Sequence, residues 1–165
     1  MANRPPRLPE FSYIGPNRYF LTVCTRARAP VLSDEAIASF VRWQFLRVAT
    51  EQHFEAIAYC VMPDHFHALV QGVQPESNFT DLVRRWKQAT GYRWKRAGHT
   101  SALWQEGYFE RILRERDPTE AVVRYIIANP LRAGLVTDIR DYPFVGSGAY
   151  DIDALLASPL DWYPR

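Results

Sequence analysis

Residues 59–70 read Tyr-Cys-Val-Met-Pro-Asp-His-Phe-His-Ala-Leu-Val and predict a strand, a turn and a second strand. Pro63 and Asp64 mark the turn, because proline cannot donate to a strand ladder and aspartate favours turns. Apolar and β-branched residues on both sides extend the two strands over 54–61 and 65–71. We therefore expect an antiparallel β-hairpin here.

The second strand of this hairpin contains a His-x-His pattern. Successive side chains of a strand point to opposite faces, so His65 and His67 emerge side by side while Phe66 faces the core. Two imidazoles on a rigid strand form half of a site for a divalent ion. Taken alone, the same pattern is also compatible with an ordinary polar strand surface.

Before and after the hairpin, hydrophobic periodicity predicts two more strands and three helices. They cover residues 18–25, 34–52, 79–97, 108–113 and 118–129. Ser33, Asn78 and Asp117 are the expected N-caps of the helices, and Pro130 is expected to end the third helix at Asn129. The order β-α-β-β-α-β-α predicts an α+β fold, a ferredoxin-like βαββαβ antiparallel sheet with one additional C-terminal helix.

Composition restricts the class of protein. The chain has 165 residues, of which 47% are apolar and 23% charged, as is typical of one globular domain. It has neither the roughly 18 consecutive apolar residues that span a bilayer nor an apolar stretch behind its basic N-terminus, so we expect a cytoplasmic protein. Only Cys24 and Cys60 are present, which argues against a disulfide scaffold. We expect residues 1–137 to form the main domain and the tail, 138–165, to pack on it.

Positive charge is concentrated before the tail. Residues 1–137 carry a net charge of +5 and the tail carries −3, and 18 of the 20 basic residues are arginine. The second helix presents basic residues beside its apolar stripe, and these are candidate phosphate contacts: Arg84, Arg85, Lys87, Arg93, Lys95 and Arg96. A solvated helix face is the alternative interpretation. Weaker candidates are Arg18, Arg26, Arg28 and Arg132.

The third helix adds a possible nucleophile. Tyr125 and Asn129 are four residues apart and therefore neighbours on one face, at the edge of its apolar stripe. Without the histidine pair, this arrangement would equally suit a tyrosine at the edge of the core and an asparagine that caps the helix C-terminus.

Three motifs follow one another in the chain: the stretch 59–70, Leu-Trp-Gln-Glu-Gly-Tyr over 103–108, and Tyr-Ile-Ile-Ala-Asn-Pro-Leu-Arg-Ala-Gly-Leu-Val over 125–136. Together they resemble the single-tyrosine HUH transposases, in particular the REP-associated tyrosine transposases. The resemblance implies that the additional helix carries the nucleophile Tyr125 and that His65, His67 and Asn129 are metal ligands. One departure is the Glu-Arg pair at 110–111, where relatives often have Asp-His.

The resemblance also implies the reaction and the partner. We expect a nuclease that cuts and rejoins single-stranded, hairpin-forming DNA through a 5′-phosphotyrosine, with Mg²⁺ or Mn²⁺ as cofactor. A monomer is favoured over a homodimer because of the 28-residue tail. Two alternatives are a non-catalytic DNA- or RNA-binding protein on the same scaffold and a His-x-His zinc hydrolase. The zinc hydrolase would lack an obvious acidic residue that could activate water.

Overall fold

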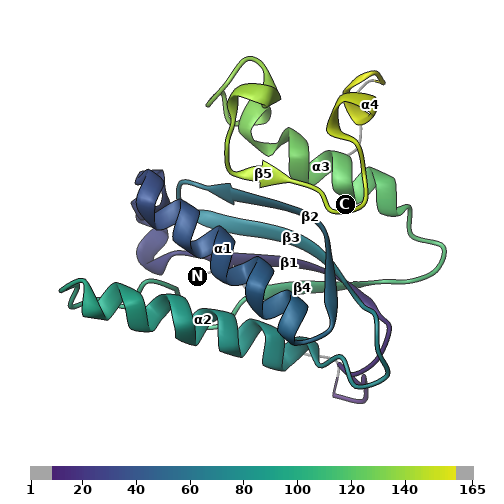
Figure 1. Ribbon diagram of the computed structural model, residues 1–165, viewed down its shortest axis with the longest axis horizontal. Coiled ribbons are helices and arrows are strands. Elements are labelled where there is room, and N and C mark those ends of the chain that lie inside the picture. The colour runs from purple at the N-terminus through teal and green to yellow at the C-terminus, as the bar shows by residue number, and fades with distance from the viewer. Residues whose placement is uncertain (1–8, 159–165) are drawn as a thin grey trace.

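The protein contains one five-stranded antiparallel sheet, packed between helices on both faces (Figure 1). The computed structural model describes residues 9–158. The strand order is β4-β1-β3-β2-β5, with β1 Arg18–Cys24, β2 Phe54–Met62, β3 His65–Gly72, β4 Phe109–Leu113 and β5 Val145–Gly146. β2 and β3 form the expected hairpin, and β1 lies between β3 and β4 as a buried inner strand. The predicted α+β antiparallel fold is confirmed.

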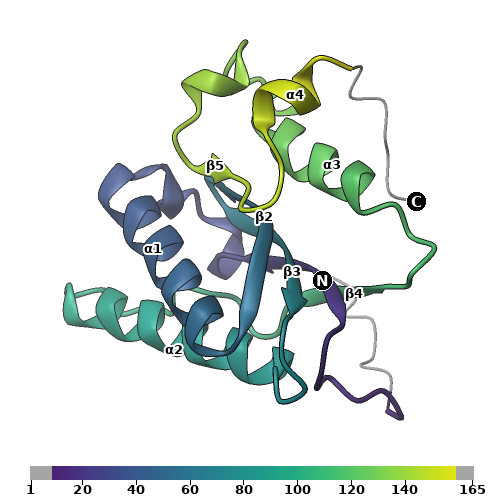
Figure 2. The ribbon, with the colours of Figure 1, turned by 45° about the vertical axis from the view of Figure 1, so that its right-hand side comes forward.

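Helices cover the two faces of the sheet unequally (Figures 1 and 2). Helices α1 (Glu35–Glu51) and α2 (Phe79–Arg96) lie on one face, and α3 (Thr119–Arg132) and the short α4 (Ile152–Leu156) lie on the other. The core beneath α1 and α2 includes Phe66 and Trp86, and the core beneath α3 includes Phe20 and Leu69. The alternation along β3 thus sends Phe66 toward α1 and α2, and it sends the histidines toward α3.

A bulge in β2 changes which face its residues occupy. The pairing with β3 shifts register between Ala56 and Ala58. Phe54 and Ala56 consequently belong to the core under α1 and α2, whereas Ala58 and Cys60 belong to the core under α3. The extra residue of the bulge reverses the alternation, so one strand contributes to both cores.

Two of the predicted N-caps are wrong. Asp34, not Ser33, caps α1 by accepting a hydrogen bond from the backbone N–H of Ile37. Asp117 does not cap α3: its carboxylate accepts from the N–H of Arg114 and closes the preceding turn. Asn78 caps α2 as expected, through the N–H of Asp81.

The predicted end of α3 is also wrong. The helix continues through Pro130 to Arg132 rather than ending at Asn129. A proline within a helix removes one backbone donor but does not unwind the helix where packing and side-chain bonds compensate. Pro130 is buried, and the Asn129 side chain supplies hydrogen bonds at this turn.

The tail packs against the α3 face over the part that the structure describes. β5 pairs with β2, and the Tyr142 hydroxyl donates to the Val61 carbonyl at 2.6 Å. Ile139 and Leu155 are buried in the same core as α3. Residues 159–165 of the predicted tail and residues 1–8 of the predicted main domain lie outside the described range. Within that range, no helix has the length and hydropathy of a membrane span.

Candidate active site

Three of the predicted site residues meet on the α3 face of the sheet. The imidazole rings of His65 and His67 lie 4.6 Å apart between centroids, and the ring of Tyr125 lies 5.9 Å from that of His67. The histidines come from an inner strand and the tyrosine from a helix packed on it. Tyr125 is held there by its helix, whose residues Ile126 and Ile127 are fully buried.

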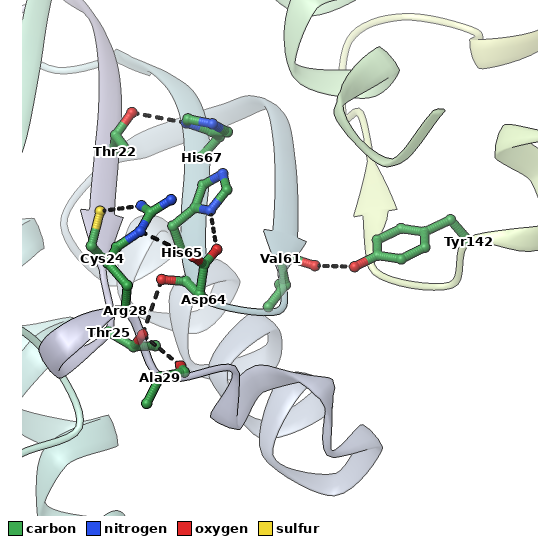
Figure 3. Close-up of polar contacts among 10 residues, drawn as sticks. All are labelled: Thr22, Cys24, Thr25, Arg28, Ala29, Val61, Asp64, His65, His67 and Tyr142. Carbon is green, nitrogen blue, oxygen red and sulfur yellow. Dashed lines mark hydrogen bonds and ion pairs between the residues drawn. The ribbon is translucent and has the colours of Figure 1, made fainter. Parts of the chain in front are cut away.

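His65 is oriented by the residue before it. Its Nδ1 lies 2.6 Å from Asp64 Oδ1, and the other carboxylate oxygen pairs with Arg28 Nε at 3.0 Å (Figure 3). An ionised carboxylate can only accept, so His65 Nδ1 donates and Nε2 keeps a lone pair for a ligand. Burial lowers the pKa of His65, and hydrogen bonding and charge from Asp64 partly oppose this effect.

His67 is held from the neighbouring strand. Thr22 stands opposite it in the β1–β3 register, and the Thr22 hydroxyl lies 2.8 Å from His67 Nδ1 (Figure 3). His67 is only 6% exposed. Burial, followed by the positive charges of His65, Arg28 and Arg132, lowers the pKa of His67 to about 3. The ring is therefore neutral at physiological pH, which is the form that binds metal ions.

Asn129 is fixed by the turn that contains Pro130. Its amide nitrogen donates to the carbonyls of Tyr125 at 2.9 Å and Ile126 at 3.4 Å. The Ile126 carbonyl is the one that the N–H of residue 130 would bind in a regular helix, and proline has none. Since only the amide nitrogen can donate, Oδ1 is the atom of Asn129 that could bind a metal ion. Asn129 is thus not a C-terminal cap.

The donors available here fit a divalent ion bound by neutral groups. His65 and His67 could offer imidazole nitrogens, and Asn129, one helical turn after Tyr125, could offer an amide oxygen. Among residues 9–158, no cluster of three or more His, Cys, Asp or Glu side chains could hold a metal ion. Asp64, the carboxylate adjacent to the pair, is engaged with His65 and Arg28. Imidazole nitrogens suit ions such as Zn²⁺ or Fe²⁺ and an amide oxygen suits Mg²⁺ or Mn²⁺, so this mixed donor set fits a divalent ion without selecting one.

A cation lies over the ring of Tyr125. The guanidinium carbon of Arg132 is 4.6 Å from the ring centroid, and Arg132 follows Tyr125 by about two helical turns of α3. On sequence alone, Arg132 and Arg28 are only weak candidates. Sequence reasoning missed Thr22, whose role depends on strand register, and it treated Asp64 as an ordinary turn residue.

The basic residues of α2 are not brought to this site, because α2 covers the opposite face of the sheet (Figure 2). Arg84 pairs with Asp81, and the Arg93 guanidinium lies over the ring of Phe40. Lys87 donates to the carbonyls of Gln105 and Gly107. Three exposed residues of the predicted set form no ion pair within the described chain: Arg85, Lys95 and Arg96.

A histidine pair on an inner strand, facing a helical tyrosine, is the arrangement expected of a single-tyrosine transposase. Residues 17–129 match the family described as "Transposase IS200 like", so the chain belongs to the IS200-like transposase family. The resemblance to REP-associated tyrosine transposases is confirmed by two curated relatives of that name, and a solved structure of one such transposase shares the fold.

Two curated relatives are named as REP-associated tyrosine transposases. One, from Haemophilus influenzae, is 27% identical over 154 residues, covering 87% of this chain and 86% of the relative. The other, from Escherichia coli, is 29% identical over 150 residues, covering 86% of each.

Two solved structures share the fold. One is a REP-associated tyrosine transposase bound to a REP hairpin, with a TM-score of 0.71 and 21% identity, covering 98% of this chain and 93% of the other. The second is a Deinococcus radiodurans protein described as a transposase, with a TM-score of 0.51 and 26% identity, covering 76% of this chain and 97% of the other.

Proposed function

We propose that this protein cuts and rejoins single-stranded, hairpin-forming DNA through a covalent 5′-phosphotyrosine on Tyr125. The observation that carries the proposal is the 5.9 Å approach of the Tyr125 ring to His67, which brings a nucleophile beside two neutral imidazoles. Family membership supports a DNA-processing enzyme, and the solved relative with a REP hairpin supports the choice of DNA.

In the proposed reaction, the Tyr125 oxygen forms a bond to phosphorus and the bond from phosphorus to the 3′ oxygen breaks. The phenolic proton leaves, and the departing 3′ oxygen gains a proton to become a free hydroxyl. Attack by a 3′ hydroxyl on the phosphotyrosine reverses these changes and rejoins a strand. No external energy source is needed, because one phosphodiester replaces another.

We propose that His65, His67 and Asn129 hold Mg²⁺ or Mn²⁺. Such an ion supplies positive charge that reduces the repulsion between a phosphodiester and an incoming oxygen. The Asp64 and Thr22 contacts keep the two imidazoles oriented, and Arg132 provides a permanent cation beside Tyr125 for the phosphate charge. The site so described needs no acidic ligand.

We further propose that the protein acts in the cytoplasm as a monomer. The support for a monomer is β5, which pairs with β2 and covers part of that edge of the sheet with the chain's own tail. Light scattering on the purified protein would test the oligomeric state, and a dimer mass would contradict this part of the proposal.

Substitution of Tyr125 by phenylalanine tests the nucleophile. We expect Tyr125→Phe to abolish the covalent adduct with a labelled hairpin strand while hairpin binding stays within a few-fold, because one oxygen is lost and almost no volume. Denaturing gels report the adduct and fluorescence anisotropy the binding. Adduct formation by the phenylalanine variant would refute Tyr125 as nucleophile. Binding without adduct by the unaltered protein, with either ion, would favour the non-catalytic alternative.

Metal binding is tested by calorimetry without DNA. We expect His65→Ala and His67→Ala to weaken Mn²⁺ binding about 10-fold or more, because each removes one of three protein ligands. His53→Ala is the matched control, since His53 is an exposed histidine directly before β2, at the end of the hairpin opposite His65. Unchanged affinity in both site variants would contradict the assigned ligands.

A further inference from the structure

A hollow of about 380 Å³ lies between α2 and the segment that follows it. Tyr92 and Lys95 line it from the helix, and Trp104 and Gln105 line it from the segment. Tyr92 is 68% exposed, the most exposed of the large apolar or aromatic side chains of the described residues. Neither the sequence motifs nor the proposed active site accounts for this exposed ring.

We propose that this hollow binds a base of single-stranded DNA, stacked on Tyr92, while Lys95 and Arg96 contact the adjoining phosphates. The inference rests on the proposed function and extends it with another DNA contact on the other layer of the molecule. Aromatic side chains beside basic residues are the usual means by which proteins hold unpaired bases without sequence preference.

The wall opposite Tyr92 is held in place by hydrogen bonds to α2. The Trp104 indole is buried and donates to the Thr90 hydroxyl at 2.8 Å. The Lys87 ammonium donates to the carbonyls of Gln105 at 3.0 Å and Gly107 at 2.9 Å, which ties the segment to α2. A hollow with fixed walls loses little entropy on binding a flat ligand, in contrast to a loop that must first order.

Space and charge both suit a nucleotide. A side chain added at Gly91, which lines the hollow next to Tyr92, would meet no atom within 4 Å. Lys95 and Arg96 are exposed and form no ion pair with any described residue, so their charge is available to an anion. Glu106, the acidic residue next to this wall in sequence, does not line the hollow.

The segment that lines the hollow is hydrogen-bonded to the end of β1, the strand next to the histidines. The backbone N–H of Gln105 donates to the Cys24 carbonyl at 3.0 Å, and Cys24 stands opposite His65 in the β1–β3 register. Gln105 is therefore two strand spacings from His65, roughly 10 Å at the backbone. In this proposal, a DNA strand held at the histidines passes around the end of β1 past Cys24 to reach the hollow on the other layer.

The test compares one hairpin with and without single-stranded flanks on its 5′ or 3′ side. Tyr92→Leu should weaken binding of one flanked hairpin about 5- to 100-fold, the range for removal of one stacked base, and leave the blunt hairpin within two-fold. Tyr92→Phe keeps the ring and should bind the flanked hairpin normally. Trp43→Leu, at a 56% exposed aromatic on α1, is the matched control and should have no effect.

A direct readout uses 5-iodouracil in place of each flank base in turn. Irradiation should crosslink one position to Tyr92, and Tyr92→Leu should abolish that crosslink. If Tyr92→Leu binds every flanked hairpin as the unaltered protein does, or no flank position crosslinks, the inference is overturned and the proposed reaction at Tyr125 stands. If the unaltered protein binds no single-stranded or hairpin DNA, the proposed function fails and this inference fails with it.

Discussion

His67 is held in its neutral form more firmly than His65, although the two rings face the same space. Thr22 offers His67 a neutral hydroxyl, whereas Asp64 offers His65 a carboxylate that favours the protonated ring. The charges of Arg28 and Arg132, and that of His65 once it is protonated, act in the same direction as the burial of His67. Two adjacent histidines therefore differ in how they respond to acid.

This difference predicts a loss of stability in acid. Between about pH 6.5, the ordinary pKa of histidine, and the pKa of about 3 for His67, the unfolded chain binds a proton that the folded chain does not. The free energy of unfolding should fall by about 1.4 kcal/mol for each pH unit below about 6 and be flat above about 7 as far as this residue is concerned.

Urea unfolding in the presence of chelator measures this dependence. His67→Gln removes the titrating group, so its unfolding free energy should depend less on pH even if the variant is less stable throughout. An equal pH dependence in the two proteins would show that His67 is not protected from protonation in the fold.

Residue alternation explains why the histidine pair could be predicted and its partners could not. The period of two along a strand is local, so the sequence over 65–67 suffices to put both imidazoles on one face. Thr22 reaches His67 only because β1 pairs with β3 in one particular register, which depends on contacts distant in sequence. The hydrogen bonds of the Asn129 side chain could not be predicted either, because they form only if α3 continues past Pro130.

Among the elements, α2 carries basic residues that look alike in sequence but have different surroundings in the structure. Its apolar stripe was predicted, and Trp86 and Trp94, which lie on that stripe, are buried. Its basic residues are equivalent in sequence but differ in their partners, because Lys87 binds backbone carbonyls while Lys95 is exposed. Sequence periodicity gives the face of a residue and not its hydrogen-bond partner.

The salt dependence of DNA binding should separate these roles. Replacing Arg85, Lys95 and Arg96 together with glutamine should reduce the slope of log affinity against log salt by up to about 2, at about 0.7 for each single-strand phosphate that is no longer neutralised. Arg84→Gln is the control on the same helix, because Arg84 is paired with Asp81 and should change the slope little. An unchanged slope in the triple variant would mean that these three residues do not contact DNA and that they form an ordinary solvated helix face.

At the scale of the whole molecule, the tail is part of the folded unit rather than an appendage. A clear hydrophobic period is lacking after residue 137, so sequence could predict that the tail packs but not how. The tail is attached to the rest of the fold by several short features and not by one long element. They include a two-residue strand, a buried leucine in a five-residue helix and a tyrosine hydroxyl that donates a hydrogen bond to β2.

Leu155→Ala should therefore destabilise the whole protein. The buried side chain lies in the same core as Ile126, so its truncation should cost about 2–5 kcal/mol in the free energy of unfolding. Its half-buried neighbour gives the control, and Leu156→Ala should cost less. Urea unfolding followed by tryptophan fluorescence would report both, and an unchanged midpoint for Leu155→Ala would mean that the tail unfolds separately from the sheet.

The sheet divides the buried side chains into two sets that share no member, one beneath α1 and α2 and one beneath α3. Packing substitutions beneath different helices and well separated across the sheet should therefore have additive effects on the free energy of unfolding. The layer that carries Tyr125 can consequently change its packing over evolutionary time without compensating changes in the other layer. The buried residues on the two sides of the sheet can therefore be substituted at different rates among relatives of this chain.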